Sequence, residues 1–458
     1  MRILLVTPPA RRPQRESIVV PPLGLMYIAT VLRQAGFDVQ LKDAFAEGLD
    51  WDAFGAFIRD AAPDVLGISG MSPVIDTTFR AVKLARPHVR HVVLGGPHAS
   101  LYRAQVFQQC PEVDVVVVGE GETTAVALMQ ALADSRPLAG IPGVVTRTVA
   151  NPDRPLIADV DTLPYPDRSL IRPELFRYPF SRYPRVTTLF TSRGCPYGCT
   201  FCDKSTFGSK WRPRSAPNVL GEIDEVVERF GIRSLIFYDD LFTVNRERVA
   251  AICEGILQRG YRIEWKCEGR VNLADLELMR LMKRAGCSMI AYGVESANPA
   301  ALAYLNKRTT PEEIERAFAL TRQAGLKTMA YFILGIPVET YADELRTIAF
   351  ARRIRPTYAQ FSVLSPYYGT RVYEDAVARG WYREIDAQNP LDKDLKRPVV
   401  LSDNWTEADL QRIVRDAHRQ FYFRPGYILR YAFALRSFAQ IRESLRVFLR
   451  IFQWLTHP

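Results

Sequence analysis

The stretch Cys195-Pro196-Tyr197-Gly198-Cys199-Thr200-Phe201-Cys202 places three cysteines within eight residues. A cubane 4Fe-4S cluster normally takes four thiolates, one for each iron. No fourth cysteine is near in the sequence. The other four, Cys110, Cys253, Cys267 and Cys287, occur singly in patterns typical of helices and strands, and we expect them to be small buried apolar residues. A cluster held by this stretch would therefore keep one iron open.

A structural zinc site is the main alternative for these thiols. Such a site takes four closed ligands from Cys or His, and the histidines lie far away in the sequence, although folding could bring one close. They are His88, His91, His98, His418 and His457. A disulfide framework does not fit, because seven cysteines is an odd number and the N-terminus carries no mark of export.

The spacing Cys-x3-Cys-x2-Cys, with an aromatic residue before the last cysteine, resembles the radical S-adenosylmethionine (SAM) enzymes. In that family the open iron is chelated by the amino and carboxylate groups of SAM. An electron from the reduced cluster then breaks a carbon–sulfur bond and releases methionine and a 5'-deoxyadenosyl radical. The resemblance implies that Cys195, Cys199 and Cys202 hold the cluster and that Phe201 packs near the adenine.

Length and composition are those of an ordinary soluble protein with two or three domains. The chain has 458 residues, of which 48% are hydrophobic and 24% charged, and a net charge of +10. That charge fits nucleic acid, an anionic membrane surface or a solvated exterior equally well, and no nucleic-acid motif is present. The first apolar run is too short for a signal peptide, and no stretch is long enough to span a bilayer. We expect a cytoplasmic protein.

Residues 1–150 alternate short apolar runs with helical patterns. Strands are expected at 3–6, 38–41, 65–68, 92–94 and 115–118, and a helix near 23–35. This alternation predicts an α/β fold with a doubly wound, Rossmann-like parallel sheet. In such sheets ligands bind beyond the carboxyl ends of the strands.

Glycines, small hydroxyls and carboxylates follow the expected strands at that edge. Glycine lets backbone approach a large flat ligand, and amides and hydroxyls can donate hydrogen bonds to it. Together with Pro21-Pro22-Leu23-Gly24-Leu25, these segments resemble the cobalamin-binding domains found ahead of radical SAM domains. The cobalamin contacts that this implies are Thr7, Pro8, Ser69, Met71, Ser72, Gly95, Gly96, Pro97, His98, Gly119, Glu120, Gly121 and Glu122.

Many cobalamin proteins carry an Asp-x-His-x-x-Gly motif whose histidine binds cobalt from below, and this sequence has none. His98 is the nearest substitute, and we interpret it as a pocket wall or hydrogen-bonding group. We therefore expect cobalt without a protein histidine below it. By analogy with the family, that absence favours methyl transfer to a carbon radical.

Residues 151–186 contain seven prolines, which disfavour both helix and central strand and predict a stiff linker. From 187 to 370 the pattern repeats helix then strand. Strands are expected at 186–190, 234–238, 263–267, 289–294, 328–334 and 358–364, and helices at 219–229, 246–259, 273–284, 312–323 and 342–354. Units of this size predict a barrel-like parallel sheet, and this region looks like the partial (β/α)6 barrel of radical SAM enzymes.

Polar residues at strand ends are the site candidates of such a barrel, because active sites gather at that rim. The resemblance implies that groups there contact SAM: Arg270 its carboxylate, through a charge-assisted bond, and Glu295 or Ser296 its ribose. A surface ion pair or helix cap would explain any one of them alone. The full set is Asp239, Asp240, Arg270, Glu295, Ser296, Gly335 and Glu339.

Residues 371–458 are predicted to be a mainly helical C-terminal region. Within it, Ile441, Leu445, Phe448, Phe452 and Leu455 recur at steps of four and three, which places them on one helical face flanked by arginines. A basic amphipathic helix of this kind can lie in a membrane interface. A helix docked on the barrel with its arginines in water fits the same pattern.

These features predict a cobalamin-dependent radical SAM methyltransferase that uses a 4Fe-4S cluster, SAM and cobalamin to methylate an unreactive carbon. We expect no dedicated general base, a small-molecule or lipid-like substrate, and an electron donor such as flavodoxin or ferredoxin. One alternative keeps these cofactors but cyclises or rearranges its substrate, as the anaerobic cyclase of chlorophyll synthesis does. Another is a cobalamin sensor whose cluster relays electrons.

Overall fold

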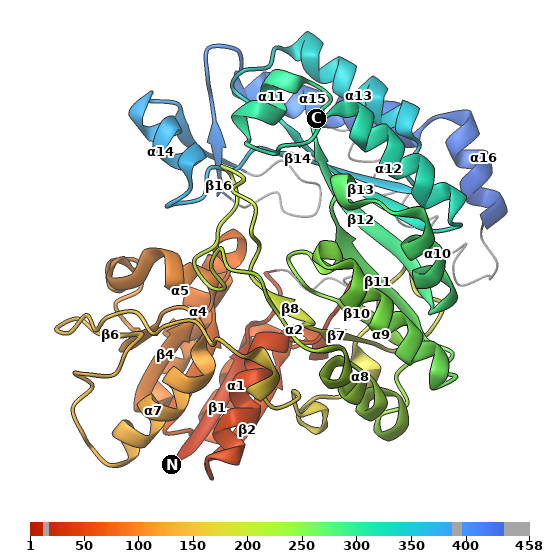
Figure 1. Cartoon of the computed structure of the whole chain (residues 1–458). Coiled ribbons are helices and arrows are strands. Elements are labelled where there is room, and N and C mark those ends of the chain that lie inside the picture. The colour runs from red at the N-terminus through yellow and green to blue at the C-terminus, as the bar shows by residue number, and fades with distance from the viewer. Residues whose placement is uncertain (12–17, 387–395, 435–458) are drawn as a thin grey trace. The chain divides into compact units, whose positions relative to one another are not determined.

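The computed structural model describes residues 1–11, 18–386 and 396–434, which fall into two compact units (Figure 1). The first unit comprises Met1–Pro196, Lys204–Glu268 and Leu281–Ser288. The second comprises Tyr197–Asp203, Gly269–Arg280 and the described residues from Met289 onward. The predicted domain boundaries at 150, 186 and 370 stay predictions.

The N-terminal sheet of the first unit is doubly wound, as predicted. Its strand order is β2-β1-β3-β4-β5-β6; β1 to β5 run parallel, and β6 pairs antiparallel with β5. The order reverses between β1 and β3, and ligands of such sheets bind at that point, beyond the carboxyl ends of the strands. The strands are β1 (Arg2–Thr7), β2 (Asp38–Asp43), β3 (Val65–Ser69), β4 (His91–Gly95), β5 (Val115–Val117) and β6 (Val144–Val145).

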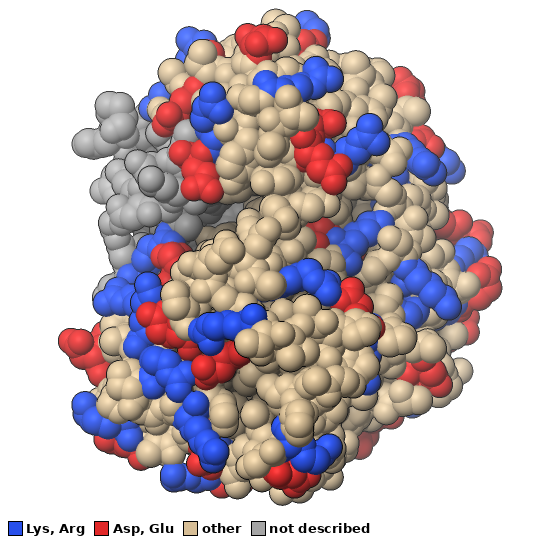
Figure 2. Space-filling view, turned by 90° about the vertical axis from the view of Figure 1, so that its left-hand side faces the viewer, with Lys and Arg blue, Asp and Glu red and all other residues tan. Residues whose placement is uncertain are grey.

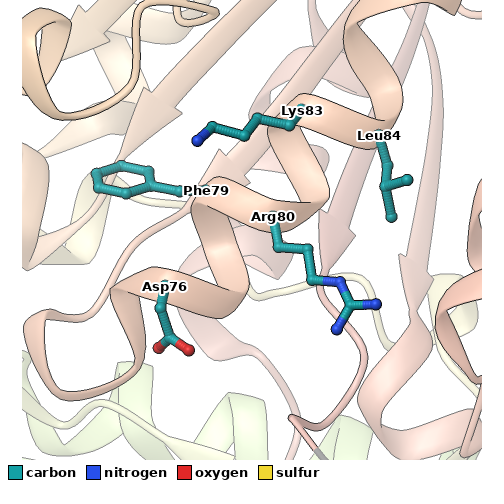
Figure 3. Close-up of a pocket in the computed structure, with 5 residues that line it drawn as sticks. All are labelled: Asp76, Phe79, Arg80, Lys83 and Leu84. Atoms are coloured by element: carbon teal, nitrogen blue, oxygen red, sulfur yellow. The ribbon is translucent and has the colours of Figure 1, made fainter. Parts of the chain in front are cut away.

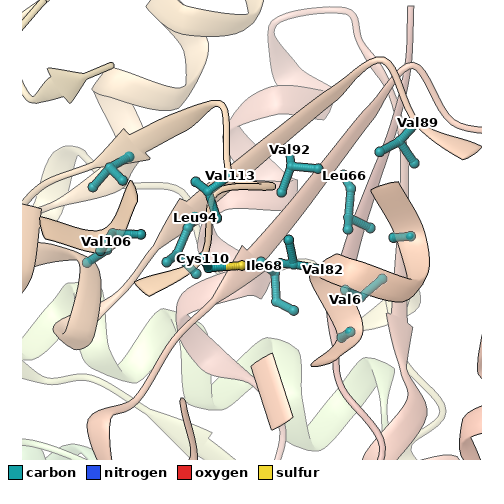
Figure 4. Packing of buried hydrophobic residues seen from close by; sticks show 14 of the residues in the cluster. Val6, Leu66, Ile68, Val82, Val89, Val92, Leu94, Val106, Cys110 and Val113 are labelled. Atoms are coloured by element: carbon teal, nitrogen blue, oxygen red, sulfur yellow. The ribbon is translucent and has the colours of Figure 1, made fainter. Parts of the chain in front are cut away.

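Helices cover both faces of this sheet because β1, β3, β4 and β5 are apolar on both sides, as buried parallel strands are. Helices α1 and α7 pack on one face with Leu5 and Val93, and α3 to α6 pack on the other with Leu4 and Leu94. Figure 4 shows part of the second cluster, including Leu94. The helices are α1 (Leu23–Gln34), α2 (Ala44–Glu47), α3 (Trp51–Ala61), α4 (Ile75–Ala85), α5 (Pro97–Tyr102), α6 (Val106–Gln109) and α7 (Gly121–Ala133), with 3-10 turns η1 (Ser72–Val74), η2 (Arg86–His88) and η3 (Arg103–Gln105).

Up to residue 185, where β7 is about to begin, the proline-rich segment 151–186 forms no α-helix and no strand of a sheet, but it is packed into the first unit. It contains three short 3-10 turns, η4 (Val160–Thr162), η5 (Arg168–Leu170) and η6 (Pro173–Leu175). The Arg168 side chain is fully buried and donates to Glu222 Oε1 at 2.7 Å and to the Thr188 carbonyl at 3.0 Å. The segment is therefore held against the following sheet by a buried ion pair.

The first unit also holds three parallel strands after the linker, in the order β11-β10-β7. They are β7 (Val186–Leu189), β10 (Ser234–Phe237) and β11 (Glu264–Gly269). Between them come β8 (Ser192–Arg193), β9 (Arg212–Pro213), α8 (Ala216–Asp224), the π-helical turn η7 (Glu225–Arg229), η8 (Phe242–Val244) and α9 (Arg246–Gln258). The predicted strands and helices of this region are confirmed to within a few residues.

The second unit contains three further parallel strands, with β13 between β12 and β14. Its elements are β12 (Cys287–Glu295), α11 (Pro299–Tyr304), α12 (Pro311–Gln323), β13 (Lys327–Leu334), α13 (Tyr341–Ile354), β14 (Tyr358–Val363), α14 (Arg371–Ala378), β15 (Tyr382–Asp386), β16 (Lys396–Val400), α15 (Glu407–Tyr422) and α16 (Pro425–Ala434); η9 (Val271–Leu273) and α10 (Leu276–Arg284) precede β12. The antiparallel pair β15–β16 was not predicted.

The predicted amphipathic tail at 441–455 lies outside the described residues. Among the described helices, none has the length and apolar character needed to cross a bilayer.

Candidate functional site

The three-cysteine stretch lies in the loop between β8 and β9. Cys195 and Cys199 are partly exposed and Cys202 is exposed, whereas the other four cysteines are buried, as predicted. Burial raises the pKa of the Cys110 thiol to about 12 and also raises the pKa of Cys253 and Cys267, so these thiols stay protonated. Because thiolates are the ligands of iron–sulfur clusters, only the loop cysteines fit that role.

The residues before Cys195 are held by a buried carboxylate at the end of β10. Asp239 accepts hydrogen bonds from the Thr191 amide, the Thr191 hydroxyl and the Ser192 hydroxyl, each at 2.6 Å. Burial raises the pKa of Asp239, and the nearby Arg248 guanidinium opposes that rise. Arg248 in turn donates to the Thr191 carbonyl. Both Asp239 oxygens are thus engaged in orienting the start of the cysteine loop, and its predicted contact with SAM stays a prediction.

The remainder of the loop is fixed within the second unit. The Thr200 amide donates to the Leu305 carbonyl at 3.1 Å, and the Val372 amide donates to the Thr200 carbonyl at 3.2 Å. Asn306 Nδ2 donates to the Gly198 carbonyl at 2.6 Å. Phe201 packs against the apolar cluster that contains Leu305 and Val372. Backbone around Cys199 and Cys202 is therefore constrained by hydrogen bonds that do not involve the thiols.

Arg270, Glu295 and a lysine that was not predicted come together in the second unit. The Arg270 guanidinium lies 3.7 Å from the centre of the Tyr197 ring and donates to the Lys307 carbonyl. Its buried Nε has no hydrogen-bond partner among the described residues. Lys307 Nζ forms a buried ion pair with Glu295 Oε1 at 2.6 Å. The unpartnered Nε of Arg270, beside Tyr197 of the cysteine loop, could therefore donate to a bound anionic group such as a carboxylate.

The Glu295–Lys307 pair lies where the backbone at the end of β12 has an uncommon conformation. Glu295 has φ +65°, and the pairing of β12 with β13 shifts register between Gly293 and Glu295. A Cβ on Gly293 would lie 2.3 Å from Glu295 Oε1 and 2.5 Å from Lys307 Nζ. Glycine at 293 is therefore required for the pair to fit. Backbone held in a rarely populated region is typical of functional sites.

Ser296, Gly335 and Glu339 form a second buried polar group, together with Glu344. Ser296 Oγ donates to Glu339 Oε1 at 2.7 Å, and the Gly335 amide donates to Glu344 Oε1 at 2.7 Å. Burial raises the pKa of Glu339 to about 7; it also raises the pKa of Glu344, to which the neighbouring Glu339 charge contributes. At neutral pH this pair holds at least one proton.

Asp240 follows Asp239 directly, and its side chain is exposed. Its role as a SAM contact stays a prediction, as do those of Phe201, Ser296, Gly335 and Glu339.

The predicted cobalamin contacts lie at the carboxyl edge of the N-terminal sheet. Thr7 ends β1, and its buried Oγ1 has no hydrogen-bond partner among the described residues. Met71 follows β3 with 56% of its surface exposed. A Cβ added to Gly119, which has φ +74°, would meet nothing within 4 Å. An unpartnered hydroxyl and an exposed apolar side chain beside the switch point, with open space at Gly119 further along the same edge, fit a large ligand there.

His98 is fully engaged within the protein. Its Nδ1 lies 3.0 Å from Ser72 Oγ, its Nε2 lies 2.8 Å from Gln109 Oε1, and its ring stacks on Tyr102. Burial lowers the pKa of the imidazole, which is therefore neutral at pH 7. Because both ring nitrogens already have partners, the geometry agrees with the interpretation of His98 as a hydrogen-bonding wall residue.

Glu120 and Glu122 are the candidates whose surroundings differ most from the prediction. Both carboxylates are buried and paired with arginines from beyond the linker: Arg193 contacts both, and Arg212 contacts Glu120 at 2.8 Å. Glycines 70 and 96 also serve local packing, since a Cβ on Gly96 would lie 2.4 Å from Ser69 Oγ. The predicted cobalamin contacts of these residues stay predictions.

A pocket of about 460 Å³ lies along α4, outside the predicted cofactor contacts (Figure 3). It is lined by Asp76, Phe79, Arg80, Lys83 and Leu84. Two of its charged groups already have partners, because Asp76 pairs with Arg11 and Arg80 stacks on Trp51.

On the face shown in Figure 2, basic side chains are interspersed with acidic ones.

Comparison with known families agrees with the predicted cofactor regions. Residues 18–129 match the B12 binding domain, and residues 189–351, which include all three loop cysteines, match the radical SAM superfamily. Over 99% of its length the chain is 33% identical to an uncharacterized methyltransferase of Pyrococcus horikoshii, 99% of which is covered. The chain belongs to the cobalamin-binding radical SAM family. Its predicted fold class and enzymatic nature are thereby confirmed, and the predicted 4Fe-4S, SAM and cobalamin set is confirmed at the level of the family.

One further relative and one solved structure are similar to this chain. An anaerobic magnesium-protoporphyrin IX monomethyl ester cyclase of Cereibacter sphaeroides is 30% identical over 89% of this chain and 68% of its own length. The solved structure of the methyltransferase TsrM from Kitasatospora setae, with cobalamin and a 4Fe-4S cluster bound, is 19% identical and has a TM-score of 0.73. That alignment covers 93% of this chain and 90% of TsrM and shows a shared fold.

Sequence reasoning missed Lys307, Arg193 and Glu344. Lys307 follows α11 in a turn whose spacing carries no metal or nucleotide signature. Arg193 stands two residues before Cys195, and its proximity to the motif was the one available signal. Glu344 lies inside a helical pattern, where a solvated carboxylate is the ordinary expectation.

Proposed function

We propose that this protein methylates an unactivated carbon of a small-molecule substrate. The observation that carries the proposal is the loop of three accessible cysteines, with no fourth cysteine nearby, in a chain that also matches the B12 binding domain. End-to-end similarity to a methyltransferase supports it. When bound, the cluster, SAM and cobalamin supply hydrogen abstraction and the methyl group, and the protein supplies placement and shielding.

The chain's own residues would divide that work as follows. Three thiolates, from Cys195, Cys199 and Cys202, would ligate the cluster. Arg270, with its unpartnered Nε, offers a hydrogen bond and positive charge to a carboxylate in the second unit. Thr7 Oγ1 is available to a ligand beyond the switch point of the N-terminal sheet. No side chain in either unit is assigned as a general base.

The experiment uses anaerobically reconstituted full-length protein with dithionite, hydroxocobalamin and SAM bearing a deuterated methyl group. The expected results are 5'-deoxyadenosine and one compound in a host-cell small-molecule extract that gains a deuterated methyl group by mass spectrometry. Turnover of SAM with no transfer of label to any compound would contradict methylation. Replacing Cys199 with alanine is the matched control and should abolish both products.

A second candidate is cyclisation or another rearrangement without methylation. Similarity to the anaerobic magnesium-protoporphyrin IX monomethyl ester cyclases of Rubrivivax gelatinosus, 28% identical, and of Cereibacter sphaeroides favours it. The same incubation separates the two functions. A product that loses hydrogens and carries no label would support the second candidate.

We also propose a cytoplasmic location, an electron donor such as flavodoxin or ferredoxin, and contact of the basic tail at 421–458 with an anionic membrane surface. Cosedimentation of the full-length chain with phosphatidylglycerol vesicles tests the membrane contact. It should weaken when Arg446 and Arg450 are both replaced by glutamate, and equal cosedimentation of the two proteins would contradict it.

A further inference from the structure

Arg193, two residues before Cys195, is enclosed by groups of the first unit. Its Nη1 donates to Glu120 Oε1 at 2.8 Å and its Nη2 to Glu122 Oε1 at 2.5 Å. The guanidinium also lies 5.1 Å from the centre of the Tyr27 ring and 5.0 Å from that of Phe207. Carboxylates and aromatic faces are both favourable partners for a guanidinium, so its position is strongly defined.

The two carboxylates come from a different part of the chain from the arginine. Glu120 and Glu122 stand at the start of α7, within the segment that matches the B12 binding domain, whereas Arg193 stands within the radical SAM match. Glu120 also accepts from Arg212 at 2.8 Å and from the Ile157 amide at 2.7 Å. Two buried carboxylates thus face two buried guanidiniums, which leaves no uncompensated charge.

The position of Cys195 depends on that of Arg193, because Gly194 between them is tightly confined. Gly194 has φ +81°, and a Cβ there would lie 2.3 Å from the Lys210 carbonyl oxygen and 2.9 Å from that of Phe207. This leaves the chain one tight path to Cys195, whose carbonyl accepts from Lys204 Nζ at 3.0 Å. Displacing the Arg193 side chain would therefore displace the first cysteine of the loop.

We propose that Arg193 is a positioning residue that ties the cysteine loop to the B12-binding segment through Glu120 and Glu122. In this assignment both glutamates serve the iron–sulfur loop, and neither is a corrinoid ligand. The inference deepens the proposed function and rests on it, because it requires that the loop hold a cluster. It predicts that removing the charge of Glu122, in the B12-binding segment, alters the spectrum of the cluster but leaves the binding of cobalamin unchanged.

The test compares Glu122→Gln and Arg193→Lys with the wild-type protein and with Asp114→Asn. Asp114 pairs with Arg86 at 2.5 Å and accepts from the Val92 amide at 2.8 Å, both within the same segment, so it is a matched control. Each full-length protein is reconstituted anaerobically with iron, sulfide and hydroxocobalamin. Three quantities are measured: cobalamin affinity by visible absorbance, the electron paramagnetic resonance spectrum of the dithionite-reduced cluster, and the SAM concentration that half-saturates the change in that spectrum.

Both test variants should bind hydroxocobalamin like the wild type, give a broadened cluster spectrum, and need about tenfold more SAM, as expected when one charge-assisted hydrogen bond is lost. Asp114→Asn should match the wild type in all three measurements. Arg193→Lys keeps the positive charge and so provides a folded variant should Glu122→Gln prove insoluble.

Wild-type spectra and SAM response in the soluble variants would overturn the inference. Loss of cobalamin with an unchanged cluster spectrum would also overturn it, by assigning Glu122 to the corrinoid. A different result would contradict the proposed function: wild-type protein that binds the cluster, SAM and cobalamin but transfers no methyl group.

Discussion

Replacing Arg168 with methionine tests whether the proline-rich segment is an integral part of the first unit. Arg168 is completely buried and donates to Glu222, to the Thr188 carbonyl and to Thr187 Oγ1. Breaking a buried ion pair costs about 3–5 kcal/mol. Because Glu222 keeps its second partner, Arg214, we expect the lower end of that range. A loss of about 3 kcal/mol corresponds to roughly a hundredfold change in the unfolding equilibrium.

Arg33→Met is the matched control, because Arg33 pairs with Asp167, the neighbour of Arg168, through side chains that are 46% and 26% exposed. An exposed pair contributes at most about 1 kcal/mol. Urea unfolding of each protein by circular dichroism gives the midpoints, and the shift multiplied by a common slope gives the change in free energy. Equal shifts for the two variants would refute the reasoning, because the segment would then be an ordinary surface connector.

Three further perturbations follow from the site. Glu339→Gln should flatten the pH dependence of stability. Burial raises the pKa of Glu339 from 4.5 to about 7, so folding takes up a proton between these two values and the free energy of unfolding falls as pH rises through them. Urea midpoints measured at about pH 5 and about pH 8 test this, and an equal change in wild type and variant between the two pH values would contradict it. Gly96→Ala should cost about 1–3 kcal/mol, since Gly96 has φ +89° and no room for a Cβ, and an unchanged thermal midpoint would count against it. Cys202→Ser should lose bound iron and 5'-deoxyadenosine formation, whereas Cys253→Ala, at a buried thiol, should retain both; iron assays distinguish these outcomes.

The elements that the sequence predicted best are those whose signal is local. The loop cysteines lie within one stretch of eight residues, and strands such as β13 and helices such as α12 follow from apolar periodicity over a few residues. The parallel, doubly wound sheet was predicted from the alternation of strands with helices, whereas the order of its strands was not predicted. For these features tertiary structure agreed with local preference.

The candidate site was predicted only in part, because its contacts join residues far apart in the chain. Glu120 and Arg193 are separated by 73 positions, and nothing near either one indicates the other. Asp239 was predicted as a SAM contact, which stays a prediction; its hydrogen bonds from Thr191 and Ser192 were not predicted. A carboxylate at a strand end is compatible with both roles, and only the fold shows which groups come within hydrogen-bond distance.

Three arginines of the first unit, Arg168, Arg214 and Arg248, donate to the strand and the residues that precede Cys195, which also explains why net charge was a poor guide to partners. The strand that leads to Cys195 is bonded along its length: Arg168 to Thr187 and Thr188, Arg214 to Phe190, Arg248 to Thr191, and Asp239 to Thr191 and Ser192. Arg193 completes the series. Polar groups that are buried and paired favour one arrangement of the chain, because any shift leaves charges unpaired. A reaction that depends on the placement of cofactors requires such rigidity, since a displacement of about 1 Å can cost a hundredfold in rate. The basic residues that matter most here therefore act inside the protein.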